Sequence, residues 1–192
     1  MAIVGGDTVS GSVLEFHVFG VGQVRKGGAV LRSGARVGDA IYVTGELGGS
    51  LSGKHLTFEP RIEEALWLRE SGWVSAMIVV SDGIATDLDH ILEQSGMGAE
   101  IAANDIPVSP AAKSAGGDRT PLEHALYDGE DYELLFTVPA DRQSAFESSW
   151  ADTFDLPCTR IGQILGERGP IVLVDGDRRS PLEGGGYEHF RG

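Results

Sequence analysis

Ser81, Asp82 and Gly83 stand between a short apolar run and a helical pattern, and their types favour the chemistry of phosphate and divalent cations. The run Met77 to Val80 has the composition of a buried strand, and the apolar stripe from Ile84 predicts a helix that begins at about Asp82 or Gly83. This turn places Ser81, Asp82 and free backbone N–H groups where a helix N-terminus attracts phosphate, and Asp82 can hold a cation. The plainer alternative is that Ser81 or Asp82 only caps the helix.

The composition is that of a globular chain which cannot offer a basic surface. The 192 residues are long enough to bury a core, and 28 glycines with 8 prolines predict many tight turns. The net charge of −14 argues against binding to nucleic acid or to an anionic membrane. Cys158 is the only cysteine and no secretion signal or membrane span is evident, so we expect a cytoplasmic protein without an internal disulfide.

Alternating short strands and helices predict an α/β or α+β fold with a mixed sheet. The expected strands, besides the central one, are residues 40–44, 99–101, 134–138, 159–164 and 171–174. The expected helices are residues 60–70, with Ile62, Ala65 and Leu66 as the apolar face, and 122–127. A further helix is expected at 141–150, capped by Asp141, with Ala145, Phe146 and Trp150 turned inward. Residues 104–115 read as a polar connection interrupted by proline.

Residues 1–25 read as the end of an incomplete domain, and residues 26–192 as a second domain. Two strands are predicted, at Ala2 to Val4 and at Ser12 to Phe19, but two strands do not make a domain, so their partners come from a second copy or from further chain. Gly6 and Asp7 lie in a turn after the first strand. A structural turn is the more frequent reading of such glycines, although Asp7 adds a carboxylate beside a backbone that a ligand can approach closely.

Several common catalytic patterns are absent from the sequence. The five histidines show no zinc spacing, and no nucleophile elbow, Walker loop or dinucleotide fingerprint is present. Arg32, before a glycine turn, reads on its own as a surface residue of a type that grips phosphate well. The acidic run Glu130 to Glu133 leads into a strand.

The ordered set of motifs resembles the thiamine-monophosphate kinase family, in the superfamily of aminoimidazole ribonucleotide synthetase and selenophosphate synthetase. The motifs are GGDT at 5–8, LRSGARVGDAIYVTGELGGS at 31–50, HLTFEPR at 55–61, VSDGIATDLDHILEQSGMGAEI at 80–101, GEDYELLFTVP at 129–139, RIGQI at 160–164 and GYEHF at 186–190. The resemblance implies the C-terminal α/β domain of such a kinase, preceded by the end of its N-terminal ATP-binding domain. It also implies a homodimer and the transfer of the γ-phosphoryl group of ATP to thiamine monophosphate with Mg²⁺.

The resemblance also implies roles for individual residues. Gly6, Asp7, Arg32 and Ser81 correspond to ATP contacts, and Asp7 and Asp82 to metal ligands. The implied substrate contacts are Glu130 and Phe190. No residue is implied as a general base, because a phosphate acceptor is already ionised near neutral pH.

One position departs from the family pattern, and alternative functions stay open. The family usually carries Asp two residues before the serine, where this chain has Val79, which removes one expected Mg²⁺ ligand. One alternative is a small-molecule-binding or regulatory module without catalysis, and another is a related enzyme with a different phosphate acceptor. The kinase reading predicts that this chain alone is inactive, because the acidic half of the site expected in the N-terminal domain is not in the sequence.

Overall fold

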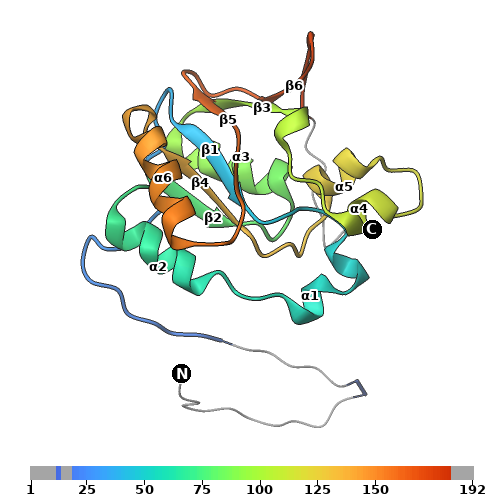
Figure 1. The fold of residues 1–192 in the computed structure, drawn as a ribbon, viewed down its shortest axis with the longest axis horizontal. Helices are drawn as coiled ribbons and strands as arrows, with labels where there is room; N and C mark the ends of the chain where they lie inside the picture. Colours follow the sequence, from blue (N-terminus) through green and yellow to red (C-terminus); the bar gives the residue numbers. More distant parts are fainter. Residues whose placement is uncertain (1–11, 14–18, 183–192) are drawn as a thin grey trace.

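A seven-stranded mixed sheet organises the part of the chain that the computed structural model describes, residues 12–13 and 19–182 (Figure 1). The strands are β1 (Ala40–Thr44), β2 (Ala76–Val79), β3 (Gly98–Ala102), β4 (Leu134–Val138), β5 (Cys158–Leu165), β6 (Ile171–Asp175) and β7 (Arg178–Pro181). Their order in the sheet is β2-β4-β1-β5-β3-β6-β7. Neighbouring strands are antiparallel except β3 and β6, which are parallel, so the predicted mixed sheet is confirmed.

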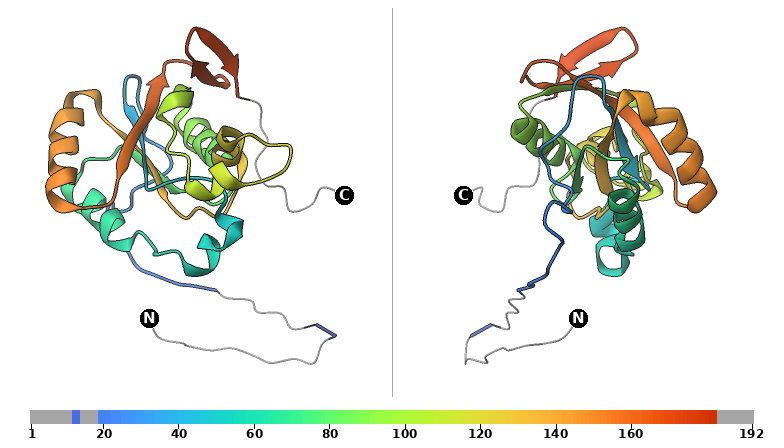
Figure 2. Two further views of the ribbon diagram at one scale, coloured as in Figure 1. Left: turned by 45° about the vertical axis from the view of Figure 1, so that its right-hand side comes forward. Right: turned by 90° about the vertical axis from the view of Figure 1, so that its left-hand side faces the viewer.

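Helices cover both faces of the sheet (Figure 2). The α-helices of the described residues are α1 (Lys54–Thr57), α2 (Ile62–Ser71), α3 (Ile84–Ser95), α4 (Pro110–Ser114), α5 (Pro121–Tyr127) and α6 (Gln143–Thr153). Helices α3 and α5 pack on one face, and α2 and α6 pack on the other. Short 3-10 turns at Ser50–Ser52, Ala103–Asp105 and Ala140–Arg142 complete the set.

Strand β1 lies in the middle of the sheet and is buried on both sides. Successive side chains of a strand point to opposite faces. Ile41 and Val43 therefore join the α3 and α5 core, whereas Tyr42 joins the core under α2 and α6. All five residues of β1 are buried. The end of β1, at Gly45, is thus a fixed point from which the following loop extends.

The core under α2 and α6 is mainly aromatic. Phe146 packs against Tyr42 with its ring edge at a centroid distance of 5.0 Å, and against Trp150 at 5.8 Å. Phe136 of β4 contacts the Phe146 ring at 5.7 Å. Such edge-to-face pairs add to the stabilisation from burial alone. This confirms that Phe146 and Trp150 point inward.

The predicted apolar face of α2 is confirmed for Ala65 and wrong for Ile62 and Leu66. Ile62 and Leu66 are 62% and 43% exposed, whereas Leu68 is fully buried and Ala65 is partly buried against the same core. Ala65 and Leu68 are three residues apart and share a face. Leu66 is one position further along than Ala65, hence turned by about 100°, and Ile62 lies in the exposed first turn.

Three other details differ from the predictions. Asp141 does not cap α6, because Ala140–Arg142 forms a 3-10 turn after Pro139 and the helix begins at Gln143 without a side-chain cap. Ala145 is exposed, being one position before the buried Phe146. The connection at 104–115 contains helix α4, and β7 was not predicted; it pairs with β6 through the turn at Gly176.

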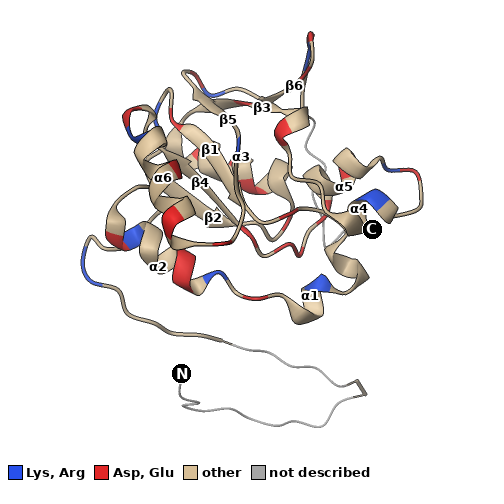
Figure 3. Cartoon of the chain, in the orientation of Figure 1, with Lys and Arg blue, Asp and Glu red and all other residues tan. Residues whose placement is uncertain are grey.

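The predicted strands at Ala2 to Val4 and Ser12 to Phe19 lie outside the described residues, apart from Ser12, Val13 and Phe19, which are not in a strand. None of the helices among residues 12–13 and 19–182 is long and apolar enough to cross a membrane. Acidic residues occur on both helix layers and in the connecting loops (Figure 3).

Candidate functional site

The turn after β2 is held by a carboxylate from the helix that follows it. Helix α3 begins at Ile84 with Gly83 as its N-cap and without a side-chain cap, so neither Ser81 nor Asp82 caps it. Asp87 Oδ2 accepts the backbone N–H groups of Ser81 and Asp82, each at 2.9 Å. Burial raises the pKa of Asp87, although these two bonds oppose the shift. The N–H groups of Ser81 and Asp82 are therefore occupied within the protein.

Residues Gly129–Glu133, which we call the acidic segment, run beside this turn. Glu130 N donates to Ser81 O and Tyr132 N donates to Val80 O, both at 2.8 Å. A side chain at Gly129 would come within 2.6 Å of Ser81 O, so this approach requires glycine. The acidic segment continues the pairing of β4 with β2 and brings Glu130 next to Ser81 and Asp82.

Glu130 and Tyr132 both adopt a left-handed backbone conformation. Their φ angles are 67° and 54°, and they are the two residues other than glycine with positive φ in the described part of the chain. The phenol of Tyr132 donates to Glu130 Oε2 at 2.6 Å, and Phe58 stacks on Tyr132 at a centroid distance of 4.1 Å. The bond to Glu130 and burial raise the pKa of Tyr132, and the charge of Asp82 adds to this rise. An aromatic pair and two carboxylates therefore gather at one place.

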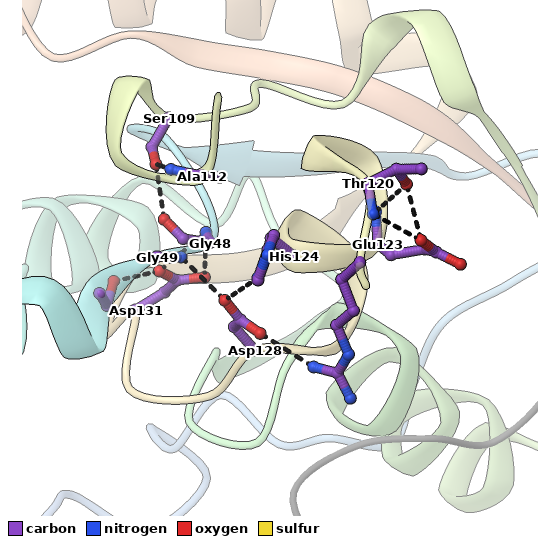
Figure 4. A network of polar contacts seen from close by, with 11 residues as sticks. Gly48, Gly49, Ser109, Ala112, Thr120, Glu123, His124, Asp128 and Asp131 are labelled. Carbon is purple, nitrogen blue, oxygen red and sulfur yellow. Dashed lines mark hydrogen bonds and ion pairs between the residues drawn. The ribbon is translucent and has the colours of Figure 1, made fainter. Parts of the chain in front are cut away.

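Asp131 anchors the acidic segment to the loop after β1, residues Gly45–Ser50, which we call the glycine loop. Its carboxylate accepts the Gly48 N–H at 2.9 and 3.0 Å and the Ser50 hydroxyl (Figure 4). Asp131 is 1% exposed, and burial raises its pKa to about 6 despite these bonds. A side chain at Gly48 would lie 2.6 Å from Ala125 N, so the glycine loop needs glycine there.

Glu133 is the second buried anchor. Its carboxylate accepts bonds from Arg61 at 2.8 and 3.0 Å, from Lys54 at 2.9 Å and from the Thr44 hydroxyl at 2.7 Å. Burial alone would raise the pKa of Glu133, but the donors from Arg61, Lys54 and Thr44 outweigh it and lower the pKa. The acidic segment is thereby tied to β1, α1 and the start of α2.

A third carboxylate, that of Asp128, also binds the glycine loop. Asp128 Oδ2 accepts the Gly49 N–H at 3.0 Å and lies 2.8 Å from Nδ1 of His124, while its Oδ1 pairs with Arg119 at 2.9 Å (Figure 4). Ser109 binds Gly48 O from the opposite side. Three side chains, those of Asp128, Asp131 and Ser109, thus bind residues 48–50 of the glycine loop.

A cavity of about 530 Å³ lies between the glycine loop, α1 and the start of α4. Lys54, Arg61 and Glu133 line it on one side, and Pro110 and Leu156 contribute apolar walls. A volume of this size fits a small organic molecule. Lys54 and Arg61 share the single carboxylate of Glu133, which offsets only one of their two positive charges.

The predicted site residues fall into three groups. Ser81, Asp82 and Glu130 are brought together by the acidic segment. Arg32 is exposed, and its carbonyl accepts from Ser95 Oγ at the far end of α3 from Ser81. A twelve-residue helix is roughly 18 Å long, so the Arg32 backbone is not beside this group.

Gly6, Asp7 and Phe190 lie outside the described residues, so their predicted roles stay predictions.

The described residues do not form a metal site by themselves. No group of three or more His, Cys, Asp or Glu side chains in residues 12–13 and 19–182 could hold an ion. Asp82 is a single carboxylate, and Val79, which is 44% exposed, stands where the resembled family has Asp. The described set does not fit a complete Mg²⁺ centre.

The sequence did not reveal the carboxylates Asp128, Asp131 and Glu133 that bind neighbouring segments. It also did not reveal Lys54 and Arg61, the basic residues that bind Glu133. The run Glu130 to Glu133 directly before a strand was the available signal. Its alternation would have assigned Asp131 and Glu133 to the side opposite Glu130 and Tyr132. Nothing in the spacing of Lys54 and Arg61 pointed to a carboxylate more than seventy residues away.

Comparison with known proteins finds thiamine-monophosphate kinases among the relatives of this chain. A thiamine-monophosphate kinase of Rhodopirellula baltica is 48% identical over 141 residues, covering 72% of this chain and 44% of that protein. The thiamine-monophosphate kinase of Haemophilus influenzae is 34% identical over 215 residues, covering 100% of this chain and 64% of that protein. The chain thus spans less than two thirds of the length of these relatives.

Solved structures that match this chain also include a thiamine-monophosphate kinase. The crystal structure of thiamine-monophosphate kinase from Stenotrophomonas maltophilia matches with a TM-score of 0.67 and 31% identity, over 82% of this chain and 56% of that one. AaThiL complexed with AMPPCP and TMP matches with a TM-score of 0.61 and 31% identity, over 84% and 54%. The family model described as AIR synthase related protein, C-terminal domain, matches residues 36–175, and the chain belongs to this family.

Proposed function

We propose that the chain is the C-terminal part of a thiamine-monophosphate kinase, which transfers the γ-phosphoryl group of ATP to thiamine monophosphate in the presence of Mg²⁺. The observation that carries the proposal is the contact between the acidic segment and the Ser81–Asp82 turn, which joins the two motifs that the resemblance assigns to substrate and nucleotide. The relatives from R. baltica and H. influenzae support it by name.

In this reaction the bond between the γ-phosphorus and the β–γ bridging oxygen of ATP breaks. A phosphate oxygen of thiamine monophosphate forms the new bond, and ADP and thiamine diphosphate leave. Transfer between two anions depends on positioning and charge neutralisation more than on proton transfer. Bound Mg²⁺ would supply much of that neutralisation. Among the described residues, Glu130 is assigned to substrate, Ser81 and Arg32 to ATP, and Asp82 to the metal.

The proposal extends to organisation. Residues 1–25 are assigned to the end of an N-terminal ATP-binding domain that supplies Gly6 and Asp7, and residues 26–192 to the C-terminal domain with Phe190 as a substrate contact. The protein is proposed to act as a cytoplasmic homodimer. The described residues contain no group of three or more His, Cys, Asp or Glu side chains that could hold an ion, which supports the expectation that this chain alone is inactive.

The test is reconstitution. The chain is coexpressed with the N-terminal portion of the H. influenzae relative that it does not cover, and thiamine diphosphate formed from ATP and thiamine monophosphate is measured by chromatography. We expect product from the pair and none from either part alone. Asp82→Asn and Glu130→Gln should reduce it at least about tenfold, whereas Asp118→Asn in an exposed turn should not. The proposal would be contradicted if the purified pair formed no more thiamine diphosphate than a blank without protein.

A second candidate is a small-molecule-binding module without catalysis, favoured by Val79 and by the lack of a metal cluster among the described residues. The reconstitution assay distinguishes it. Such a module binds thiamine monophosphate in an isothermal titration but gains no transfer activity from the N-terminal partner.

A further inference from the structure

We propose that Asp131 is a positioning residue: by anchoring to the glycine loop, it holds Glu130 and Tyr132 in their left-handed conformation beside the Ser81–Asp82 turn. The part of this inference that concerns ligand affinity rests on the proposed function, since it takes Glu130 as a substrate contact. The part that concerns geometry stands on the contacts alone.

The first step is the division of the acidic segment into two sides. Asp131 and Glu133 are both 1% exposed and bind the glycine loop, α1 and the start of α2. Glu130 and Tyr132 are half-buried and bind each other, with Phe58 on the Tyr132 ring. Alternate residues of the acidic segment therefore contact different partners.

The second step is strain. A left-handed conformation at a residue other than glycine persists only where the surroundings impose it. Here two such residues, Glu130 and Tyr132, flank Asp131 on either side. The backbone bonds of Glu130 and Tyr132 to β2 fix the main chain from one side, and the Asp131 carboxylate fixes it from the other.

The third step is the rigidity of what Asp131 holds. Gly48 is wedged against the backbone of His124 and Ala125, and Ser50 is 1% exposed. The glycine loop starts at the end of the buried strand β1, which cannot shift without disturbing both cores. Because the glycine loop is rigid, its bonds to Asp131 fix the position of the acidic segment.

The alternative is that Asp131 only accepts the hydrogen bonds of the glycine loop and has no effect on the conformation of Glu130 and Tyr132. Two serine variants separate these roles. Ser50→Ala removes a donor to Asp131, whereas Ser109→Ala removes the hydroxyl that binds Gly48 O on the other side of the same loop. Both changes delete a buried hydroxyl contact of the glycine loop, and Ser109→Ala also removes the side-chain cap of α4, but only Ser50→Ala touches Asp131. Asp131→Asn is the stronger variant.

The geometric readout is the ionisation of Tyr132, followed by the NMR signal of its ring carbon after labelling with ¹³C-tyrosine and assigned through Tyr132→Phe. Its pKa lies above the ordinary value of 10.0 because of the bond to Glu130. We expect Ser50→Ala and Asp131→Asn to move it toward 10.0, and Ser109→Ala to leave it in place. If Tyr132 titrates as in the wild type in a folded Ser50→Ala variant and in a folded Asp131→Asn variant, the positioning role is overturned. If Asp131→Asn does not fold, Ser50→Ala decides alone.

The second readout is the affinity of the chain for thiamine monophosphate, measured by isothermal titration. We expect Asp131→Asn to weaken binding about tenfold, Ser50→Ala less, and Ser109→Ala by no more than about twofold. Equal weakening by Ser50→Ala and Ser109→Ala would contradict positioning. A wild-type chain that binds no thiamine monophosphate contradicts the binding-module candidate and the affinity part of this inference. The Tyr132 readout still decides the geometric part, and the reconstitution assay decides the proposed function.

Discussion

Arg61 binds the buried carboxylate of Glu133 through two parallel hydrogen bonds, Nε to Oε2 at 2.8 Å and Nη2 to Oε1 at 3.0 Å. The pair joins the start of α2 to the end of the acidic segment across 72 residues of chain. A fork-to-carboxylate pair of this kind is both strong and directional. With Lys54 on the same carboxylate, it fixes the wall of the cavity beside the glycine loop.

Glu133→Gln should therefore destabilise the chain strongly. The amide cannot balance Arg61 and Lys54, and breaking a buried ion pair on one side costs about 3–5 kcal/mol. Urea unfolding at pH 7 measures the change. Glu70→Gln is the control, because Glu70 pairs with Arg69 while 70% exposed and should change the free energy of unfolding by less than about 1 kcal/mol. Equal effects of the two variants would contradict the buried role of Glu133.

Asp131 should give the stability an unusual pH dependence. Its folded pKa of about 6 lies above the ordinary value of 3.8, so the folded state binds more protons between these pH values. The free energy of unfolding therefore falls, on account of this group, as pH rises through 6. Lys54, which opposes the shift, and Glu133, which adds to it, are the charged groups that face Asp131.

The measurement is urea unfolding of the wild type and of Asp131→Asn at pH 7 and pH 5. We expect the wild type to gain about 1 kcal/mol relative to the variant on going from pH 7 to pH 5. The other titratable groups contribute equally to the free energy of unfolding of both proteins, so their contribution cancels when the two values are subtracted. The same difference at both pH values would show that Asp131 titrates normally.

Much of the fold was predictable because the strands carry their signal locally. The bounds of β1 and β4 agree with the predicted 40–44 and 134–138, since each is a short apolar run closed by glycine or proline. Helix faces were harder. The faces of α2 and α6 depend on which side meets the aromatic core, and a pattern with Ile62 and Leu66 apolar but exposed does not reveal that side.

The site was predictable only where residues adjacent in sequence share a turn. Ser81 and Asp82 were identified because a strand and a helix bracket them. The partners of Asp131 were not, because the Gly48 N–H and the Ser50 hydroxyl come from a loop about eighty residues away whose glycines read simply as a turn. Contacts between distant segments depend on the register of the whole sheet, which single motifs do not encode.

Gly48→Ala should destabilise the chain more than Gly96→Ala. Both glycines have positive φ, 83° and 69°, so the backbone strain of an alanine should lower the free energy of unfolding by a similar amount, about 1 kcal/mol, at each position. A side chain at Gly48 also meets Ala125 N at 2.6 Å, whereas one at Gly96 meets nothing within 4 Å. Thermal and urea unfolding should show an extra loss of about 2 kcal/mol at Gly48. Equal losses would mean that the glycine loop is not wedged against α5.

The last prediction concerns Val79 and the metal. Val79 is 44% exposed at the end of the edge strand β2, on the face opposite the buried Ile78 and Val80. An aspartate there reaches solvent, so Val79→Asp should lower the free energy of unfolding of the chain by no more than about 1 kcal/mol. By strand alternation it also points to the same side as Ser81, the residue before Asp82. Two carboxylates can share a cation that one alone holds weakly.

Val79→Asp should therefore raise the Mg²⁺ affinity of the chain at least about threefold, whereas Asp82→Asn should lower it. The double variant Val79→Asp with Asp82→Asn should behave as Asp82→Asn does or bind slightly better. Isothermal titration with Mg²⁺ and thermal melts with and without the ion measure both properties. Val37→Asp, which adds the same charge at an exposed valine outside this turn, controls for unspecific charge effects. If Val79→Asp changes neither the Mg²⁺ affinity nor the effect of Mg²⁺ on melting, position 79 is not beside the metal, and the correspondence between this stretch and the family motif fails there.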